Sequence, residues 1–405
     1  MQVGVCVETH AGVSSQNRNP LIYNRMKRLC KDIDITDRGL ISRAVYACLN
    51  KKYKRNDVTK YLSQVSGLDR KYIRCIYYRY GKSAMYPFTE LVIAEIQQEI
   101  THNTISFPAI WYREKVDGSS GKVRCIGIQN IKQQLYDYIA VEGLQPVIRR
   151  IGEYQYASIE GRGTTKGKEV ISRWIRNKNM RYFVKLDVRK CFESIDHKKL
   201  MEFLRRHIRN ELLLDLINLL IRSFERGLSI GSYLSQYLCN LYMSILYHEI
   251  MENMYRMRNS KKRVNLVRHC LIYMDDILMI GSRKRDMEKA VRLTVRKAAE
   301  MGLEIKLTYQ VRQIDGNCID MLGYKIYRTH AEIRGRTYLR VRRAFRRARK
   351  CLTEVLARKC LSYNGYLIHT NSKRMQRKLK TTETLQRCKE LIKYESKIFT
   401  AATAG

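Results

Sequence analysis

The sequence predicts an α+β fold in which a mixed central region lies between two basic segments of helical pattern. Hydrophobic residues make up 45% of the 405 residues, which is ordinary for a globular chain and enough for a large core. Only 4 prolines are present, as expected of a helix-rich protein. Short apolar runs at 182–186 and 271–280 alternate with helical patterns, so we expect a small sheet with helices against one face.

Residues 1–105 predict a basic helical region. Positions 1–19 are mostly polar, and from 20 to about 105 apolar residues recur at helical spacing among basic ones. Thr36 or Asp37 stands where it can cap the helix that follows.

Residues 106–180 predict a hairpin followed by helices. Residues 110–115 and 123–128 have the composition of strands, and residues 117–121 (Asp-Gly-Ser-Ser-Gly) have that of a turn. A helix is expected from 131 to about 144, and a loop and a further helix follow Tyr154.

Residues 181–336 and 337–405 differ in character. The first segment contains a buried strand at 182–186 and two short strands within 271–280, with helical patterns between them. From about 337 the chain becomes very basic, and residues 340–350 are mostly Arg with a few apolar positions at helical spacing. We therefore expect a mixed region followed by a basic helical module.

The charge balance predicts a polyanionic partner. Lys and Arg total 78 against 38 Asp and Glu, a formal net charge of +40. Such an excess repels itself unless a polyanion or salt screens it. Nucleic acid is the expected partner and a membrane surface the weaker alternative. The most apolar stretch, 212–221, is short and carries Asp215, so no span of a bilayer is expected.

The cysteines and the start of the chain predict a cytoplasmic protein. The 12 cysteines are scattered without a CxxC pair, which argues against both disulfides and a zinc site. Cys191, Cys239 and Cys270 stand in apolar patterns typical of buried thiols. Residues 1–19 lack the pattern of a signal peptide.

Three aspartates stand out against apolar surroundings. Asp275 and Asp276 interrupt the apolar run 271–280, and Asp187 ends the apolar strand 182–186. Taken singly, the pair has an ordinary explanation as an exposed hairpin turn, and Asp187 as a helix cap. Together, in a chain of charge +40, they predict a site for two divalent cations about 4 Å apart, which would activate a primer 3′-hydroxyl and neutralise phosphates. Mg²⁺ fits this donor set, with Mn²⁺ as an alternative.

These residues resemble a known family. Tyr273-Met274-Asp275-Asp276 looks like the catalytic box of reverse transcriptases, and Asp187 with Phe192 resembles their first palm motif. The resemblance implies that Asp187 and Asp275 bind both metal ions and that Asp276 assists. It also places Phe192 as an aromatic wall against C2′ of the nucleotide, which implies the use of deoxynucleotides. Core packing is the alternative for Phe192.

The resemblance extends from about residue 115 to 327 and implies a right-hand polymerase fold. The expected parts are the helical N-terminal extension (1–105), fingers (106–180), a palm of antiparallel sheet and helices with fingers insertions (181–336) and a basic helical thumb (337–405).

Further motifs resemble the sites that hold the triphosphate and the product. Lys122-Val123-Arg124 looks like the triphosphate-binding stretch of the family, so Arg124 is expected to bind the nucleotide with help from Lys115 on the opposite strand. Lys306 is expected to act as general acid for the leaving pyrophosphate. A surface arginine and a solvated strand lysine are the ordinary alternatives.

Two glycine-containing segments resemble template and primer contacts. Arg162, in the segment Glu160 to Thr164, is expected to reach a template phosphate, with a plain Gly-rich turn as the alternative. Gly323 lies in a segment that looks like the primer grip and would allow a hairpin to pack closely against the primer backbone.

The segment from Ile230 to Gln236 departs from the usual family pattern. Ile230 and Gly231 are expected at the nucleotide, and Ser235 and Gln236 at the template, with a turn and helix cap as the alternative. Most reverse transcriptases have Gln-Gly and then Ser-Pro here. Ile and Gln instead match diversity-generating retroelement enzymes and some phage-related or defence-associated bacterial ones. Because Ile230 cannot donate the hydrogen bond of a glutamine, we hypothesise reduced fidelity.

The leading hypothesis is therefore an RNA-directed DNA polymerase of a bacterial retroelement or anti-phage defence system. Its expected partners are an RNA template, the DNA product, dNTPs, a dedicated non-coding RNA and an accessory protein, but no membrane. The alternatives are a non-catalytic RNA-binding or splicing-helper protein with a retained polymerase fold, and an RNA-dependent RNA polymerase, which Phe192 disfavours.

Overall fold

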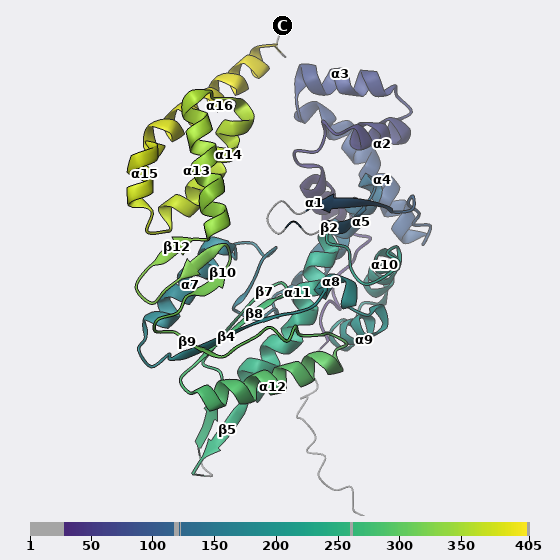
Figure 1. Ribbon diagram of the computed structural model, residues 1–405. Helices are drawn as coiled ribbons and strands as arrows, with labels where there is room; N and C mark the ends of the chain where they lie inside the picture. Colours follow the sequence, from purple (N-terminus) through teal and green to yellow (C-terminus); the bar gives the residue numbers. More distant parts are fainter. Residues whose placement is uncertain (1–27, 117–120, 122, 260–261, 403–405) are drawn as a thin grey trace, which may run out of the picture.

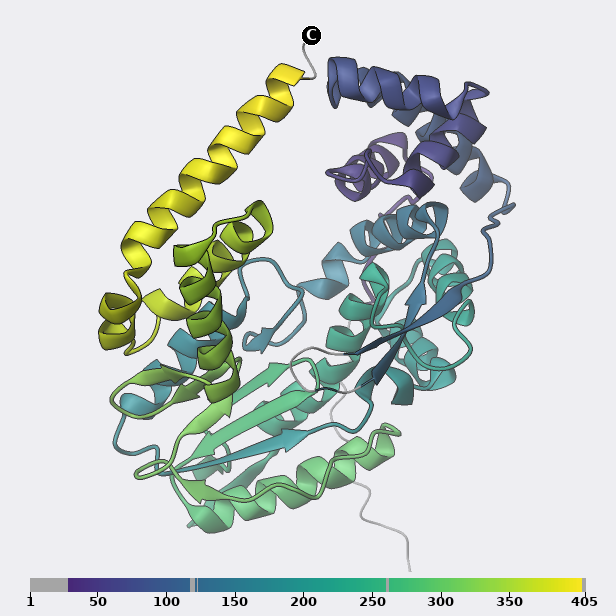
Figure 2. The same ribbon diagram turned by 45° about the horizontal axis from the view of Figure 1, so that its top comes forward.

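The computed structural model describes residues 28–116, 121, 123–259 and 262–402, with side chains up to 394. The expectations for the polar first residues, for most of the turn at 117–121 and for Lys122 lie outside these residues. Within them, N-terminal and C-terminal helices rise on opposite sides of a central sheet (Figures 1 and 2).

The N-terminal helices form one end of the molecule. They are α1 (Arg38–Leu49), α2 (Asn56–Ser66), α3 (Arg70–Tyr80), the short η1 (Ser83–Met85) and α4 (Tyr86–Thr101). Asp37, one of the two predicted caps, accepts a hydrogen bond from the backbone N–H of Leu40 at 2.7 Å and so begins α1. α1 packs against α4 and against α5 (Ile131–Gly143), which joins these helices to the rest of the fold.

The predicted hairpin is present. β1 (Trp111–Val116) and β2 (Val123–Ile128) pair in antiparallel register, with Lys115 opposite Arg124. β1 is exposed along its whole length, and only the end of β2 near Gly127 is buried. The hairpin therefore stands out from the body and presents basic side chains to its surroundings.

The central sheet has five strands in the order β3–β7–β8–β4–β9. Their bounds are β3 (Gln155–Tyr156), β4 (Tyr182–Asp187), β7 (His269–Tyr273), β8 (Asp276–Gly281) and β9 (Arg312–Gln313). All neighbouring pairs are antiparallel except β3 with β7, which is parallel.

Both faces of this sheet are buried, so the expectation of helices against one face was incomplete. Val184 and Leu186 of β4 point into the main core beside α11 (Tyr233–His248) and α12 (Lys284–Glu300). Phe183, next to Val184 in sequence, points into a second core formed with α7 (Thr164–Arg176) and the strands β10 (Ile319–Met321) and β11 (Tyr324–Ile326). The strand β12 (Ala331–Ile333) pairs with β11. Burial on both faces explains why these strands are continuously apolar rather than alternating.

The remaining elements surround the main core. They are α6 (Gln145–Ile148), α8 (Cys191–Ser194), α9 (His197–His207), α10 (Glu211–Arg222), η2 (Glu249–Asn253) and the hairpin of β5 (Tyr255–Arg258) with β6 (Lys262–Asn265). None of the described helices is long and apolar enough to cross a membrane.

The C-terminal helices form a third core of their own. α13 (Gly335–Lys350), α14 (Glu354–Ile368), α15 (Lys373–Leu379) and α16 (Thr381–Ala402) pack around Phe345, Ala348 and Cys360. The predicted Arg-rich helix is α13. Its basic residues are mostly exposed, while Val341, Ala344, Phe345 and Ala348 form its buried stripe.

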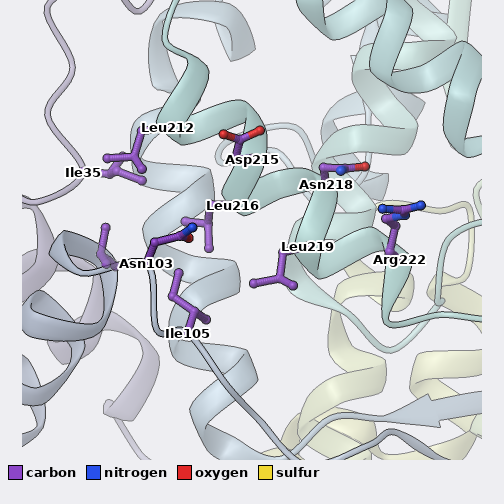
Figure 3. Close-up of a pocket in the computed structure, with 10 residues that line it drawn as sticks. Ile35, Asn103, Ile105, Leu212, Asp215, Leu216, Asn218, Leu219 and Arg222 are labelled. Atoms are coloured by element: carbon purple, nitrogen blue, oxygen red, sulfur yellow. The ribbon is translucent and has the colours of Figure 1, made fainter.

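One cavity of about 240 Å³ lies between α10 and the segment after α4 (Figure 3). Apolar side chains such as Ile105 and Leu219 line it, with Asp215 and Arg222 toward its edge (Figure 3). None of the predicted site residues lines it.

Candidate active site

The sheet brings the three predicted aspartates together at one end. The antiparallel register of β4 and β8 places Asp187 directly opposite Asp276. Asp275 stands at the tip of the β7–β8 hairpin, and its carbonyl oxygen accepts a hydrogen bond from the N–H of Val188 at 3.0 Å. Residues almost ninety positions apart in the sequence thus share one corner of the sheet.

The hairpin tip is a two-residue turn with an unusual backbone. Tyr273 pairs with Asp276, so only Met274 and Asp275 make the connection. Met274 adopts a left-handed φ of +53°, which costs a non-glycine residue roughly 1 kcal/mol or more. Two-residue hairpin turns favour positive φ because their twist then matches that of the strands. The tight turn holds Asp275 at the extreme end of the sheet, next to the end of β4.

Two lysines form ion pairs with two of the three aspartates. Lys185 Nζ lies 2.9 Å from Asp276 Oδ1. Lys306 Nζ forms an ion pair with Asp187, and the Lys306 backbone N–H donates to the Asp187 carbonyl oxygen at 2.9 Å. The predicted general acid therefore lies at the site, although its role in proton transfer stays a prediction.

Burial and mutual repulsion act on two of the carboxyl groups. Burial raises the pKa of Asp275, and the charge of Asp187 raises it further, whereas Lys306 and Arg124 lower it. Burial likewise raises the pKa of Asp276, against the lowering effect of Lys185. A cation placed among these oxygens would relieve both causes. Within the described residues, no cluster of three His, Cys, Asp or Glu side chains is arranged as a ready-made metal cage.

A family comparison identifies the chain. A family model described as reverse transcriptase (RNA-dependent DNA polymerase) matches residues 114–326, which is more than half of the 405 residues. The chain belongs to the reverse transcriptase family. The matched segment includes the whole central sheet and all three aspartates, so the predicted family, palm-type fold and enzyme class are confirmed.

Other comparisons show only distant similarity to this reverse transcriptase. No curated protein sequence matches it. Among solved structures, a C-terminally truncated apo telomerase from Candida tropicalis has 14% identity and a TM-score of 0.42, with 58% of this chain and 59% of that chain covered. The BmCPV RNA-dependent RNA polymerase at quiescent state has 10% identity and a TM-score of 0.44, with 72% and 27% covered.

The residues predicted to bind the nucleotide lie on the β1–β2 hairpin and on the turn that packs against it. Arg124 is close enough to Asp275 to lower the pKa of that carboxyl, and Lys115 is its cross-strand neighbour. Gly231 packs on β2, where a Cβ would lie 2.8 Å from the carbonyl oxygen of Gly127. Ile230, next to it, is half-buried. The glycine therefore permits the turn to lie directly on the hairpin.

Phe192 follows Asp187 closely. It lies on the short helix α8, half-buried and packed against the main core, and its carbonyl oxygen accepts a hydrogen bond from Leu228 at 2.8 Å. Core packing, the alternative reading of this residue, is thus present. The predicted contact with a sugar stays a prediction.

The structure contradicts the predicted template contact of Ser235. Ser232 caps α11 by accepting a hydrogen bond from the Ser235 N–H at 3.1 Å. Because the cap fixes where the helix begins, the side chain of Ser235 lies on the side of α11 that faces the core. Ser235 is only 1% exposed, so its side chain cannot reach a template strand in this conformation. Gln236 is half-buried, and its side-chain oxygen accepts a hydrogen bond from Ser158.

Arg162 has a structural role that the sequence did not reveal. Its Nη1 donates to the carbonyl oxygens of Gly152 at 2.7 Å and Gln155 at 3.3 Å. The guanidinium therefore braces the loop between α6 and α7 from within, which accounts for an arginine here without a template phosphate. A contact of its other nitrogen atoms with the template stays a prediction.

Gly323 packs against the C-terminal helices. It has a φ of +86°, and a Cβ there would lie 3.1 Å from the ring of Tyr366 on α14. The close approach that the sequence predicted is present, but its partner in the structure is this tyrosine. Contact with a primer stays a prediction.

Three buried polar residues hold the site in shape and were missed by sequence reasoning. Asp137 on α5 accepts hydrogen bonds from Ser232 Oγ at 2.7 Å and from the N–H of Leu234 at 3.3 Å, and so ties α5 to the start of α11. Gln155 donates to the carbonyl oxygen of Asn240 at 2.9 Å, and Asn240 donates to that of Ala157 at 3.0 Å. These bonds fasten the loop beside Tyr273 to α11.

Proposed function

We propose that this reverse transcriptase copies an RNA template into DNA by nucleotidyl transfer assisted by two metal ions. One observation carries the proposal: the register that sets Asp187 opposite Asp276, with Asp275 beside them at the hairpin tip. Hard carboxylate oxygens are the ligands that Mg²⁺ takes, with Mn²⁺ as an alternative. Bound there, the ions would activate the primer 3′-hydroxyl and neutralise the triphosphate.

Each predicted site residue then has a separate role in the reaction. Asp187 and Asp275 hold the ions and Asp276 assists, while Lys115 and Arg124 bind the triphosphate from the β1–β2 hairpin. Lys306, now paired with Asp187, donates a proton to the leaving pyrophosphate. That pair supports the assignment, because it places the ammonium group at the end of the sheet where the aspartates lie.

We propose that the fold has the fingers, palm and thumb subdomains of a right-hand polymerase. We assign the fingers to 106–180, the palm to 181–336 and the thumb to 337–405, with 1–105 as an N-terminal extension. The helix α7 belongs to the fingers segment in sequence, yet it packs against the central sheet and β11. Arg-rich α13 would follow the backbone of the template–product duplex and make binding sensitive to salt.

The biological setting we propose is a bacterial retroelement or anti-phage defence system. The Ile230-to-Gln236 pattern supports this choice. A dedicated non-coding RNA and an accessory protein would then be partners, and the enzyme would act in the cytoplasm. The +40 charge supports an RNA partner.

Primer extension tests the proposal. Purified protein is given an RNA template with a DNA primer and either dNTPs or rNTPs, with Asp275→Asn as the matched inactive variant. DNA synthesis that Asp275→Asn abolishes is expected. Synthesis only from rNTPs would indicate an RNA polymerase instead, and RNA binding without any synthesis would indicate a non-catalytic binder.

Phe192→Ala tests the choice of sugar in the same assay. Removing the ring should raise rNTP incorporation relative to dNTP incorporation by at least about tenfold, since a steric contact of roughly 1.4 kcal/mol is lost. An unchanged ratio would leave Phe192 with core packing alone.

A further inference from the structure

Helix α3 has a surface that the fold does not use. Of its eleven residues only Ile73 is buried. The helix rests mainly on α2 and η1, with Tyr77 stacked on Tyr53 at a ring-centroid distance of 6.3 Å. It lies at the outer end of the N-terminal helices, far from the central sheet and across from the C-terminal end of α16 (Figures 1 and 2).

The exposed side of α3 combines rings with positive charge. Tyr72 and Tyr80 are 55% and 65% exposed, and Tyr78 is exposed as well. The segment from 70 to 89 contains five Lys or Arg residues and no Asp or Glu; the five are Arg70, Lys71, Arg74, Arg79 and Lys82. Among the described residues, no carboxylate forms an ion pair with a cation of α3.

The order of these residues sets them in two adjacent stripes. Residues three or four apart share one side of a helix. Lys71, Arg74 and Tyr78 therefore form one stripe, and Tyr72 and Arg79 lie on a second, beside the first. The first stripe sets the ring of Tyr78 next to the guanidinium group of Arg74, and the second sets a ring and a guanidinium group two turns apart on one side of the helix.

The exposed tyrosines and the positive charge of α3 together indicate what kind of molecule it binds. Exposed rings on which bases stack, combined with cations that follow the backbone, are the features of proteins that bind single strands. A duplex hides its bases and would leave the tyrosines unused, and an apolar protein partner would bury cations that have no carboxylate partner among the described residues. We propose that α3 binds an unpaired stretch of the RNA template, outside the palm. The choice of RNA rests on the proposed function, but the binding itself needs no catalysis.

Binding of an RNA oligonucleotide of about 20 nucleotides, followed by fluorescence anisotropy of the full chain, tests the inference. Tyr72→Ala with Tyr78→Ala should weaken binding at least about 25-fold, because each stacked base contributes on the order of fivefold or more. Tyr72→Phe with Tyr78→Phe keeps both rings and should bind as the wild type does. Lys71→Ala with Arg79→Ala should lower the slope of log affinity against log salt by roughly 1.4, at about 0.7 per phosphate contact.

Matched controls lie elsewhere on the surface. Tyr255→Ala removes an exposed ring from β5, and Lys289→Ala with Arg292→Ala removes two exposed cations from α12. Both should change affinity less than about twofold. If these controls weaken RNA binding as much as the α3 variants, or the α3 variants bind normally, the inference is overturned. A DNA oligonucleotide of the same length is the second arm, and a loss confined to DNA also overturns it.

Primer extension on a template with only a few unpaired nucleotides separates this inference from the proposed function. The α3 variants should extend that short substrate at the wild-type rate and lose efficiency only on a long overhang. Wild-type protein that makes no DNA would refute the proposed function, while the anisotropy result would still decide the role of α3.

Discussion

Asp137→Asn should remove a pH-dependent loss of stability. Asp137 is 1% exposed, and burial raises the pKa of its carboxyl from 3.8 to about 6, although the Ser232 hydroxyl partly lowers it. A raised pKa means that the fold prefers the protonated carboxyl. The stability that protonation contributes is fully present below about pH 4 and is lost as the pH rises through about 6.

The magnitude follows from the pKa difference. A rise from 3.8 to about 6 corresponds to roughly 3 kcal/mol, at about 1.4 kcal/mol per pH unit. Asparagine cannot ionise, yet it keeps an oxygen for the hydrogen bonds from Ser232 and Leu234. The variant should therefore escape this loss while keeping the link between α5 and α11.

Urea unfolding of wild type and variant at about pH 4.5 and pH 7.5 measures the effect. The free energy of unfolding of Asp137→Asn, relative to wild type, should increase by roughly 2 kcal/mol from the lower to the higher pH. Ser232→Ala is the control, since it removes a donor that lowers the pKa of Asp137 and should enlarge the wild-type loss. A difference between variant and wild type that stays constant within about 0.5 kcal/mol would refute the reasoning.

Three further predictions concern catalysis. Lys185→Met should move the acidic limb of the pH–rate profile to higher pH, because Lys185 lowers the pKa of Asp276 and the carboxylate must be ionised to bind a cation; an unmoved limb contradicts this. Gly231→Ala should reduce kcat/KM for dNTPs at least about tenfold, because its Cβ meets the Gly127 carbonyl oxygen, whereas Gly335→Ala, which meets open space, should not. Ile230→Gln should lower misincorporation on an RNA template, and an unchanged error rate would remove the fidelity hypothesis.

The aspartates were predictable because their signal is local. Asp187 ends an apolar strand, and Asp275 with Asp276 interrupts another. Buried carboxylates in such places are costly unless something compensates them. The hairpin, α5 and the cap by Asp37 were predictable for the same reason, since each depends on residues close together in the chain.

Other features depend on contacts between distant segments. Asp137 and Asn240 look like ordinary polar positions on helices, and only the packing of α5 and the loop against α11 reveals their partners. Ser235 was predicted at the template, but the cap at Ser232, one turn before, fixes where α11 begins and so which side of the helix faces the core. Burial of the second face of the sheet by α7, β10 and β11 likewise needs the tertiary fold.

Binding of Mn²⁺ tests the central claim most directly. Electron paramagnetic resonance would count the ions bound to the protein with primer–template and dNTP, using a primer that lacks its 3′-hydroxyl. The wild type should bind two ions, and Asp187→Asn with Asp275→Asn should lose both while still binding the primer–template. Full Mn²⁺ binding by that double variant would contradict a metal site built on these carboxylates.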